Sequence, residues 1–393
     1  MPEERIYTDE LRTLGWGTDA SFYRQIPQVV VRSDGEAEIS KIVCACRKYK
    51  LPFTFRAAGT SLSGQSCTDS VLIVAGKHWE NYVLEVRGED GEVREYTDAS
   101  GISLASSTSE AAKPSAHLSH LTSIKLQPGI VGARVNQILK PFGRVFPPDP
   151  ASIGSAMVGG IVVNNASGMN CGVHANSDRM MLSARIVLTD GTVLDTGDAQ
   201  SREEFRKTHP AFIDRIEQLR DKVRADKELA DRITKKYSIK NVTGLNLRPL
   251  VAYDDPFDII AHSMVGSEGT LAFLSEVTMK TLKDYPFKAS AMVYFMTMKE
   301  SCEAVVAMKK MKAGEEDLEY SAENLVVKSA EMLDYKSLSS VDDPVYLQYQ
   351  KDVDAGKIEG VEPGDYHNLT AILTETKGIT HEQLLDKIAK IHE

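Results

Sequence analysis

The residues with the clearest chemical potential lie between Arg56 and Gln65, in the order Arg-Ala-Ala-Gly-Thr-Ser-Leu-Ser-Gly-Gln. Gly59, Gly64 and their small neighbours leave room for several backbone N–H groups to approach an anion such as a phosphate. The hydroxyls of Thr60 and Ser61 add donors. Arg56 adds a cation that could orient the loop, touch the anion or form a surface ion pair. Because an ordinary surface turn has the same composition, the loop alone leaves both interpretations open.

Further motifs follow downstream, at residues 147–150 (Pro-Pro-Asp-Pro), 153–160, 164–172 and 266–271. Gly159 and Gly160 would let the backbone approach a ligand closely, although tight packing of a strand against a helix would favour the same residues. Asn164, Asn165 and Ser167 offer amide and hydroxyl partners to a polar ligand. The order and content of these segments indicate one binding site assembled from several loops.

These ordered motifs resemble the FAD-binding domain of the vanillyl-alcohol oxidase and p-cresol methylhydroxylase superfamily, in particular its D-lactate and D-2-hydroxyglutarate dehydrogenase branch. The resemblance covers residues 25–285. It implies an α+β fold, in which a two-subdomain p-cresol methylhydroxylase-type FAD-binding domain is followed by part of an α+β cap domain for the substrate. It implies the following cofactor-binding residues: Arg56, Ala58, Gly59, Thr60, Ser61, Leu62, Ser63, Gly64, Gln65, Pro128, Gly129, Pro148, Asp149, Gly154, Ser155, Gly159, Gly160, Val162, Asn164, Asn165, Ala166, Ser167, Glu268 and Gly269.

The chain departs from the family pattern at two places. Members that attach FAD covalently often use a histidine in the first loop, where this chain has Thr60 and Ser61, so we expect non-covalent FAD. The family usually places an aromatic residue after the glycine at position 244, where this chain has Leu245. Any flavin or substrate contact of that aromatic ring therefore does not carry over.

The pattern along the chain predicts a lead-in at residues 1–24, an FAD-binding domain at 25–285 (subdomains 25–80 and 81–285) and an incomplete α+β cap domain at 286–393. Strands are expected at 28–32, 51–55, 71–75, 84–86, 92–96, 124–129, 185–189, 192–195, 269–283, 290–296 and 369–374, and helices at 37–50, 130–140, 205–236, 299–312 and 381–391. Because no strand follows the last helix to complete its layer, we expect the N-terminal part of a longer protein.

Composition narrows the class of protein. The chain has 393 residues, of which 42% are hydrophobic and 26% charged, with a net charge of −10. That charge argues against a nucleic-acid partner, and no apolar run reaches the ~20 residues that span a bilayer. The five cysteines lack metal-ligand spacing, so no metal is expected in this segment. A cytoplasmic location is expected, and peripheral membrane association stays open.

The resemblance implies an FAD-dependent dehydrogenase that takes a hydride from C2 of a D-2-hydroxy acid, such as D-lactate or D-2-hydroxyglutarate, onto the flavin. Electrons would pass to an iron–sulfur domain, a quinone or a carrier protein, and any iron–sulfur cluster would lie downstream of this chain. The catalytic residues are unknown and are expected beyond residue 393, although Glu268 as general base stays open. The alternatives are a flavin-binding electron-transfer or regulatory module without substrate chemistry, an oxidase that uses oxygen, and a scaffold without cofactor.

Overall fold

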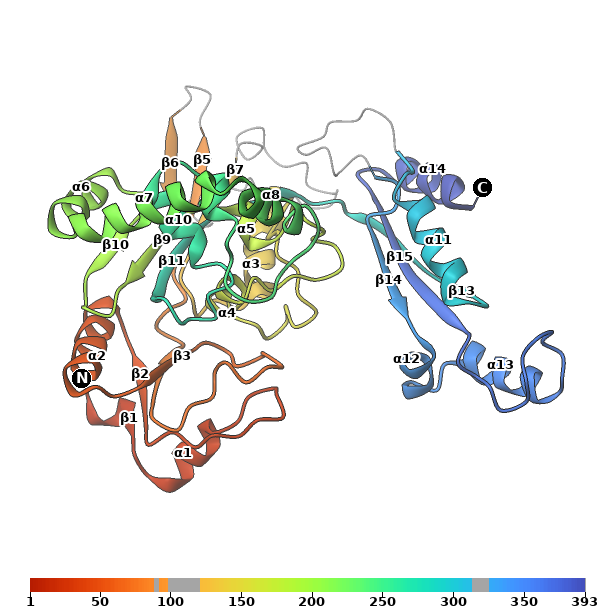
Figure 1. Cartoon of the computed structure of the whole chain (residues 1–393), viewed down its shortest axis with the longest axis horizontal. Coiled ribbons are helices and arrows are strands. Elements are labelled where there is room, and N and C mark those ends of the chain that lie inside the picture. The colour runs from red at the N-terminus through yellow and green to blue at the C-terminus, as the bar shows by residue number, and fades with distance from the viewer. Residues whose placement is uncertain (88–91, 98–120, 313–324, 393) are drawn as a thin grey trace, which may run out of the picture. The chain divides into compact units, whose positions relative to one another are not determined.

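The computed structural model describes residues 1–87, 92–97, 121–312 and 325–392 (Figure 1). Its contacts divide the chain into two compact units, Met1–Leu282 and Lys283–Glu393. The domain boundaries expected from the sequence remain a proposal, and each unit is described by itself.

A four-stranded sheet with the order β1-β2-β4-β3 opens the first unit. Strands β2, β4 and β3 are parallel, and β1 is antiparallel to β2. Helix α2 connects β2 to β3, which lie parallel on either side of β4. The bounds are β1 Ile6–Tyr7, α1 Glu10–Trp16, β2 Val29–Ser33, α2 Glu36–Tyr49, β3 Phe53–Arg56 and β4 Val71–Ala75, with a 3₁₀ turn at Glu3–Arg5. The strands and the helix expected in this region are confirmed.

The second sheet of this unit is antiparallel, with the order β10-β9-β11-β7-β5-β6. Its strands are β5 Tyr82–Arg87, β6 Val93–Tyr96, β7 Leu121–Leu126, β9 Met181–Val187, β10 Val193–Asp195 and β11 Phe273–Lys280; the short strands β8 (Arg144–Val145) and β12 (Leu282–Lys283) lie outside it. The turn expected between β5 and β6 lies outside the described residues. Phe273 of β11 packs with Ile39 and Val43 of α2, so one hydrophobic cluster joins the two sheets.

The hairpin predicted at Asp190-Gly191 is confirmed as the β9–β10 connection. Leu188 N donates to Thr192 O at 2.9 Å, and Gly191 N donates to Leu188 O at 2.9 Å. Gly191 has φ +85°. The turn is therefore a three-residue loop closed by a left-handed glycine, the second most common way to join two antiparallel strands.

Helices cover the second sheet and line its loops (Figure 1). The charged segment expected as helical at 205–236 divides where Pro210 begins α7 and where Asp226 caps α8 by accepting from Leu229 N. The helices are α3 Gly132–Leu139 (followed by a 3₁₀ turn at Lys140–Phe142), α4 Val158–Val163, α5 Ser177–Met180, α6 Ala199–Thr208, α7 Pro210–Ala225, α8 Lys227–Lys236, α9 Pro249–Ala252 and α10 Pro256–Ser263.

The second unit contains an antiparallel sheet of order β13-β15-β14. Its elements are β13 Phe287–Phe295, α11 Met298–Met308, β14 Ser329–Leu333, α12 Tyr335–Ser340, α13 Pro344–Asp354, β15 Thr370–Gly378 and α14 His381–His392. Tyr346, Tyr349 and Val353 of α13 pack on Leu369 and Ala371. Strands β13 and β15 and helices α11 and α14 confirm the expected elements, whereas β14, α12 and α13 were not expected.

Candidate functional site

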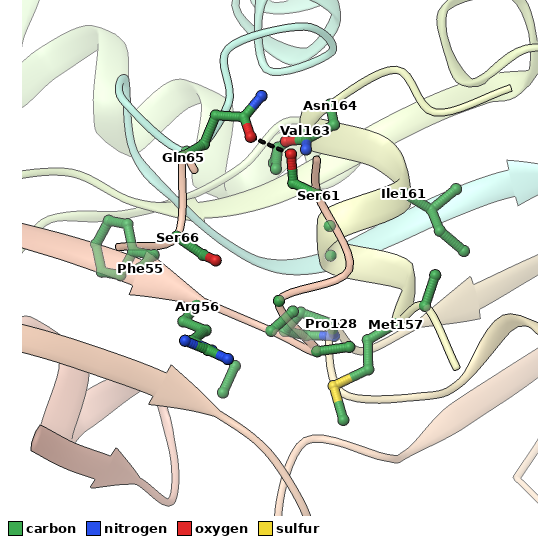
Figure 2. A pocket seen from close by; sticks show the side chains of 18 of the residues that line it. Phe55, Arg56, Ser61, Gln65, Ser66, Pro128, Met157, Ile161, Val163 and Asn164 are labelled. Carbon is green, nitrogen blue, oxygen red and sulfur yellow. Dashed lines mark hydrogen bonds between the residues drawn. The ribbon is translucent and has the colours of Figure 1, made fainter. Parts of the chain in front are cut away.

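A cavity with about 900 Å³ of empty space opens in the first unit, between its two sheets. Three segments form most of its wall: the loop after β3, helix α4 with its lead-in, and the turn before β11 (Figure 2). This figure includes space that is open to solvent, so the cavity is a cleft and not an enclosed chamber. A second cavity shares Phe55, Gln65, Glu268, Gly269 and Ala272 with the first.

The loop after β3, which we call the phosphate loop (residues 57–66), reverses direction at two glycines. Gly59 has φ +71° and Gly64 has φ +77°, a conformation that side-chain-bearing residues adopt at a cost. Ser61 donates a hydrogen bond to Gln65 Oε1, which closes the loop on itself (Figure 2). The small side chains leave the backbone of this loop accessible from the cavity.

Arg56 lies at the end of β3, directly beneath the phosphate loop. Its Nη1 donates to Thr18 O at 2.8 Å and to Trp16 O at 3.2 Å, and its guanidinium stacks on the Trp16 ring at 5.2 Å. Burial lowers the pKa of Arg56 from its ordinary value, although it remains a cation. The surface ion pair considered from the sequence is not what the structure shows, because these contacts are to main-chain carbonyls and a ring.

Helix α4 brings two consecutive glycines to the cavity for different reasons. Gly159 N donates to Pro128 O at 3.0 Å, and a β-carbon at Gly159 would lie 2.6 Å from Pro128 Cβ. A β-carbon at Gly160 would meet only Ala57 Cβ, at 3.9 Å. Gly159 is therefore required for packing, whereas Gly160 leaves an open cradle in the cavity wall that a bound group can fill.

Glu268, in the turn before β11, also lines the cavity. Its backbone is left-handed, with φ +55°, and its N–H donates to Val163 O at 2.9 Å. Its carboxylate accepts a hydrogen bond from Gln65 Nε2 at 3.2 Å. Among the described residues, Glu268 and Arg56 are the only carboxylate and cation in the lining.

The Pro-Pro-Asp-Pro segment and the asparagine-rich loop pack against each other. Asp149 N donates to Cys171 Sγ at 3.2 Å, and a β-carbon at Gly168 would overlap Asp149 O. Among the buried side-chain atoms of the described residues that have no hydrogen-bond partner, four lie in or near this loop: Asn165 Oδ1, Ser167 Oγ, Asn170 Oδ1 and Asn241 Nδ2. Buried polar atoms rarely stay unpaired, so this region fits a polar group that is not part of the chain.

The structure brings together many of the residues predicted for the site. The lining includes Arg56, Ala58, Gly59, Thr60, Ser61, Gln65, Pro128, Gly159, Gly160, Asn164, Ala166, Glu268 and Gly269. The other predicted residues lie outside the lining: Leu62, Ser63, Gly64, Gly129, Pro148, Asp149, Gly154, Ser155, Val162, Asn165 and Ser167. Their role in cofactor binding remains a prediction.

Sequence reasoning missed part of the wall, which consists mainly of apolar and small residues. These are Phe55, Ala57, Ser66, Ala75, Ser152, Ala156, Met157, Ile161, Val163, Ala272, Phe273 and Leu274. Most of them adjoin a predicted motif, so extending each motif by one turn or strand would have found them. Met157 and Ile161 lie one helical turn apart and present apolar surface near the phosphate loop (Figure 2).

A buried polar network lies behind the asparagine-rich loop. Asp178 accepts from Asn246 Nδ2 at 2.6 Å and from Arg248 Nη1 at 3.1 Å, and His262 Nδ1 donates to Asp178 O at 3.1 Å. Burial lowers the pKa of His262 to about 4. Lys240 Nζ donates to Gly168 O at 2.9 Å, which ties the same 237–248 segment to the asparagine-rich loop. His174 is exposed and is not part of the network.

These features fit a dinucleotide cofactor. A diphosphate needs hydrogen-bond donors that are not screened by bulky side chains, and the phosphate loop supplies such donors. A flavin ring needs an apolar wall and a main chain that it can approach closely, and α4 and β11 supply both. The open cradle at Gly160 leaves room in the cavity wall for such a ligand.

The FAD binding domain family matches residues 27–95 and 117–197, so this part of the chain is an FAD binding domain. The resemblance drawn from the motifs is confirmed, and FAD is the cofactor that the domain takes.

The chain is also similar in sequence to three named proteins. The chain is 25% identical over 295 residues to D-2-hydroxyglutarate dehydrogenase of Haemophilus influenzae, covering 71% of this chain and 25% of that protein. It is 26% identical over 284 residues to the Escherichia coli D-2-hydroxyglutarate dehydrogenase, covering 70% and 25%. It is 22% identical over 366 residues to the glycolate oxidase subunit GlcD of Escherichia coli, covering 91% and 54%. The chain thus spans about a quarter of the length of the dehydrogenases that it matches.

A solved structure of alkyldihydroxyacetonephosphate synthase aligns with the whole chain and with 56% of its own length, at a TM-score of 0.56 and 13% identity. This likeness concerns the fold alone. Together with the family match it confirms the expected α+β class, with a p-cresol methylhydroxylase-type FAD-binding domain. None of the described helices is long and apolar enough to cross a membrane, and the described residues hold no group of three or more potential metal ligands.

Proposed function

We propose that this chain is the flavin-binding part of a dehydrogenase that oxidises a D-2-hydroxy acid, such as D-2-hydroxyglutarate or D-lactate, to the 2-oxo acid. The observation that carries the proposal is the cavity between the two sheets, in a chain whose relatives are D-2-hydroxyglutarate dehydrogenases and glycolate oxidase subunits. When bound, FAD supplies the acceptor for a hydride from C2 of the substrate.

The residues of this chain bind and orient the cofactor in this proposal. Main-chain amides of the phosphate loop hold the diphosphate, and the apolar wall around Met157 and Ile161 excludes water from the ring system. The described lining contains no histidine, cysteine or tyrosine, which supports non-covalent FAD.

The proton of the substrate hydroxyl needs an acceptor that the described lining does not offer. Arg56 is a guanidinium cation and cannot accept a proton, and in this proposal the Glu268 carboxylate holds the rim by accepting from Gln65. We therefore place the general base outside this lining, together with the groups that select the hydroxy acid. The electron acceptor is proposed to be an iron–sulfur domain, a quinone or a carrier protein.

Anaerobic reduction of the flavin tests this function. The full-length gene product, loaded with FAD, should lose its oxidised-flavin absorbance on addition of D-2-hydroxyglutarate or D-lactate, and the L-enantiomers serve as matched controls. If no 2-hydroxy acid reduces the flavin while dithionite does, the substrate proposal is wrong and an electron-transfer module is the better description. Stoichiometric hydrogen peroxide under air would instead indicate an oxidase.

A further inference from the structure

The segment between α1 and β2 forms a closed loop, residues 17–25, which we call the N-terminal loop. Thr18 and Arg24 form a β-bridge, and Gln25 N donates to Gly17 O at 3.0 Å. The loop precedes the residues that match the FAD binding domain family, which begin at position 27. Its contacts nevertheless go to the phosphate loop.

Two of these contacts hold the main chain of the phosphate loop. Ala20 N donates to Gly59 O at 3.0 Å, beside the left-handed turn. A β-carbon at Gly64 would lie 2.7 Å from the Tyr23 ring, so the second turn rests directly on that ring. Both glycine turns of the phosphate loop are therefore fixed from outside the family-matched region.

Asp19 adds a side-chain contact between the same two loops. Its Oδ2 accepts from Ser66 Oγ at 2.9 Å, and its Oδ1 accepts from Ser21 N at 2.8 Å. Burial opposes ionisation of Asp19, but the hydrogen bonds from Ser21 and Ser66 outweigh it and hold its pKa below the ordinary value. The carboxylate is thus charged at neutral pH and accepts both bonds in that form.

Arg56 completes the support from beneath. Its Nη1 is shared between Thr18 O and Trp16 O, and Gly59 lies so close that a β-carbon there would be 2.5 Å from Nη2. Figure 2 shows the guanidinium below the loop that carries Ser61. The printed hydrogen bonds of Arg56 both come from Nη1 and go to the chain just before the N-terminal loop and to the loop itself, while Nε is buried without a partner.

We propose that the N-terminal loop is a structural part of the FAD site: it holds the phosphate loop in its binding shape, and Arg56 is a positioning residue that acts through this contact rather than as a phosphate ligand. The proposal depends on FAD as cofactor and not on which hydroxy acid is oxidised. It predicts that residues remote from the ligand change FAD affinity by loosening residues 57–66 before any cofactor binds.

The test combines FAD affinity with hydrogen exchange of the cofactor-free protein, using the variants Arg56→Lys and Asp19→Ala. Lysine keeps the charge but lacks the flat guanidinium that lies against the Trp16 ring and beneath Gly59. Both variants should bind FAD at least about tenfold more weakly, equivalent to about 1.4 kcal/mol. Both should also speed exchange of the amides in 57–66 without FAD. Arg47→Gln, an exposed charge loss on α2, is the matched control and should change neither quantity.

Two outcomes would overturn the proposal. Weaker FAD binding by Arg56→Lys with unchanged exchange in the cofactor-free protein would mean that Arg56 contacts the phosphate directly. Unchanged affinity and exchange in Asp19→Ala would mean that the N-terminal loop is not part of the site. Asp19→Ala decides the matter if Arg56→Lys does not fold. If the natural protein does not bind FAD, the assignment of FAD as cofactor is wrong instead. Hydrogen exchange in the cofactor-free protein would still show whether the N-terminal loop holds the phosphate loop.

Discussion

Gln65 Nε2 donates a hydrogen bond of 3.2 Å to Glu268 Oε1, which joins the phosphate loop to the turn before β11. Gln65 in turn accepts from Ser61, so three side chains form one connection between the two sheets at the rim of the cavity. Glu268 holds this position with φ +55°, a conformation that costs a non-glycine residue of order 1 kcal/mol. We infer that the side chain of Glu268 contributes to the site through this hydrogen bond.

Replacing Glu268 with glycine separates that role from the backbone. Glu268→Gly relieves the left-handed strain but increases the entropy of the unfolded chain, so the free energy of unfolding should stay within about 1 kcal/mol of the natural protein. FAD affinity should fall several-fold, because Gln65 loses its partner and the rim loosens. Urea unfolding and fluorescence titration with FAD measure the two effects. Unchanged affinity would show that the Gln65–Glu268 bond does not contribute to the site.

Gly159 and Gly160 provide a matched pair of alanine variants. Gly159→Ala places a methyl group 2.6 Å from Pro128 Cβ and should destabilise the protein by about 1–3 kcal/mol. Gly160→Ala meets only Ala57, at 3.9 Å, so its cofactor-free stability should be unchanged or slightly higher, since alanine favours a helix.

For FAD affinity per folded molecule, the order of the two variants should be the reverse of the order in stability, with Gly160→Ala the more affected. Gly160→Ala fills the cradle and should reduce binding by tenfold or more. If Gly160→Ala is fully folded and binds FAD like the natural protein, then the cofactor does not approach this part of α4.

The sequence predicted the parts of the fold that depend on local patterns. The continuous apolar run at Val71–Ala75 identified β4, because a strand that is buried on both faces is apolar at every position. The helical spacing of Ile39, Val43 and Cys46 identified α2, because a helix that is buried on one face repeats its apolar residues at that period. In the second unit, β14 is half exposed and α12 has six residues, so neither carries a clear period. Such elements take their conformation from tertiary contacts.

The site was predictable to the extent that it consists of glycine-rich motifs. Arg56 was identified, but its partners are carbonyls of Trp16 and Thr18, which no side-chain pattern reveals. Asp178 and His262 are 84 positions apart, and their contact depends on the packing of α5 against α10. Contacts of this kind follow from the assembled fold and not from a motif.

An ion pair joins the two sheets at the start of α2. Arg185 Nε and Nη2 donate to Glu36 at 2.6 and 2.9 Å, and Ser275 Oγ also donates to Glu36 at 2.6 Å. Because the pair is partly exposed, Glu36→Ala should lower the free energy of unfolding by about 1–2 kcal/mol. Glu203→Ala, which breaks the exposed Glu203–Lys207 pair on α6, should cost less than about 0.5 kcal/mol. Equal losses in urea unfolding would show that Glu36 does not join the sheets.

His262 gives the protein a predicted loss of stability in mild acid. Burial lowers its pKa from 6.5 to about 4 in the folded state, so the unfolded chain binds a proton first as the pH falls. The contribution of neutral His262 is intact above pH 6.5 and declines from there toward pH 4. At about pH 5 the loss should be about 2 kcal/mol relative to about pH 7.5.

The variant His262→Gln cannot titrate in this window, so its free energy of unfolding should fall less between the same two pH values, whatever its absolute stability. His392→Gln, which removes an exposed histidine at the end of α14, is the control for a general loss of one histidine. Urea unfolding at both pH values gives the comparison. The same pH-dependent loss in the natural protein and in His262→Gln would show that His262 is not held neutral by the buried network around Asp178.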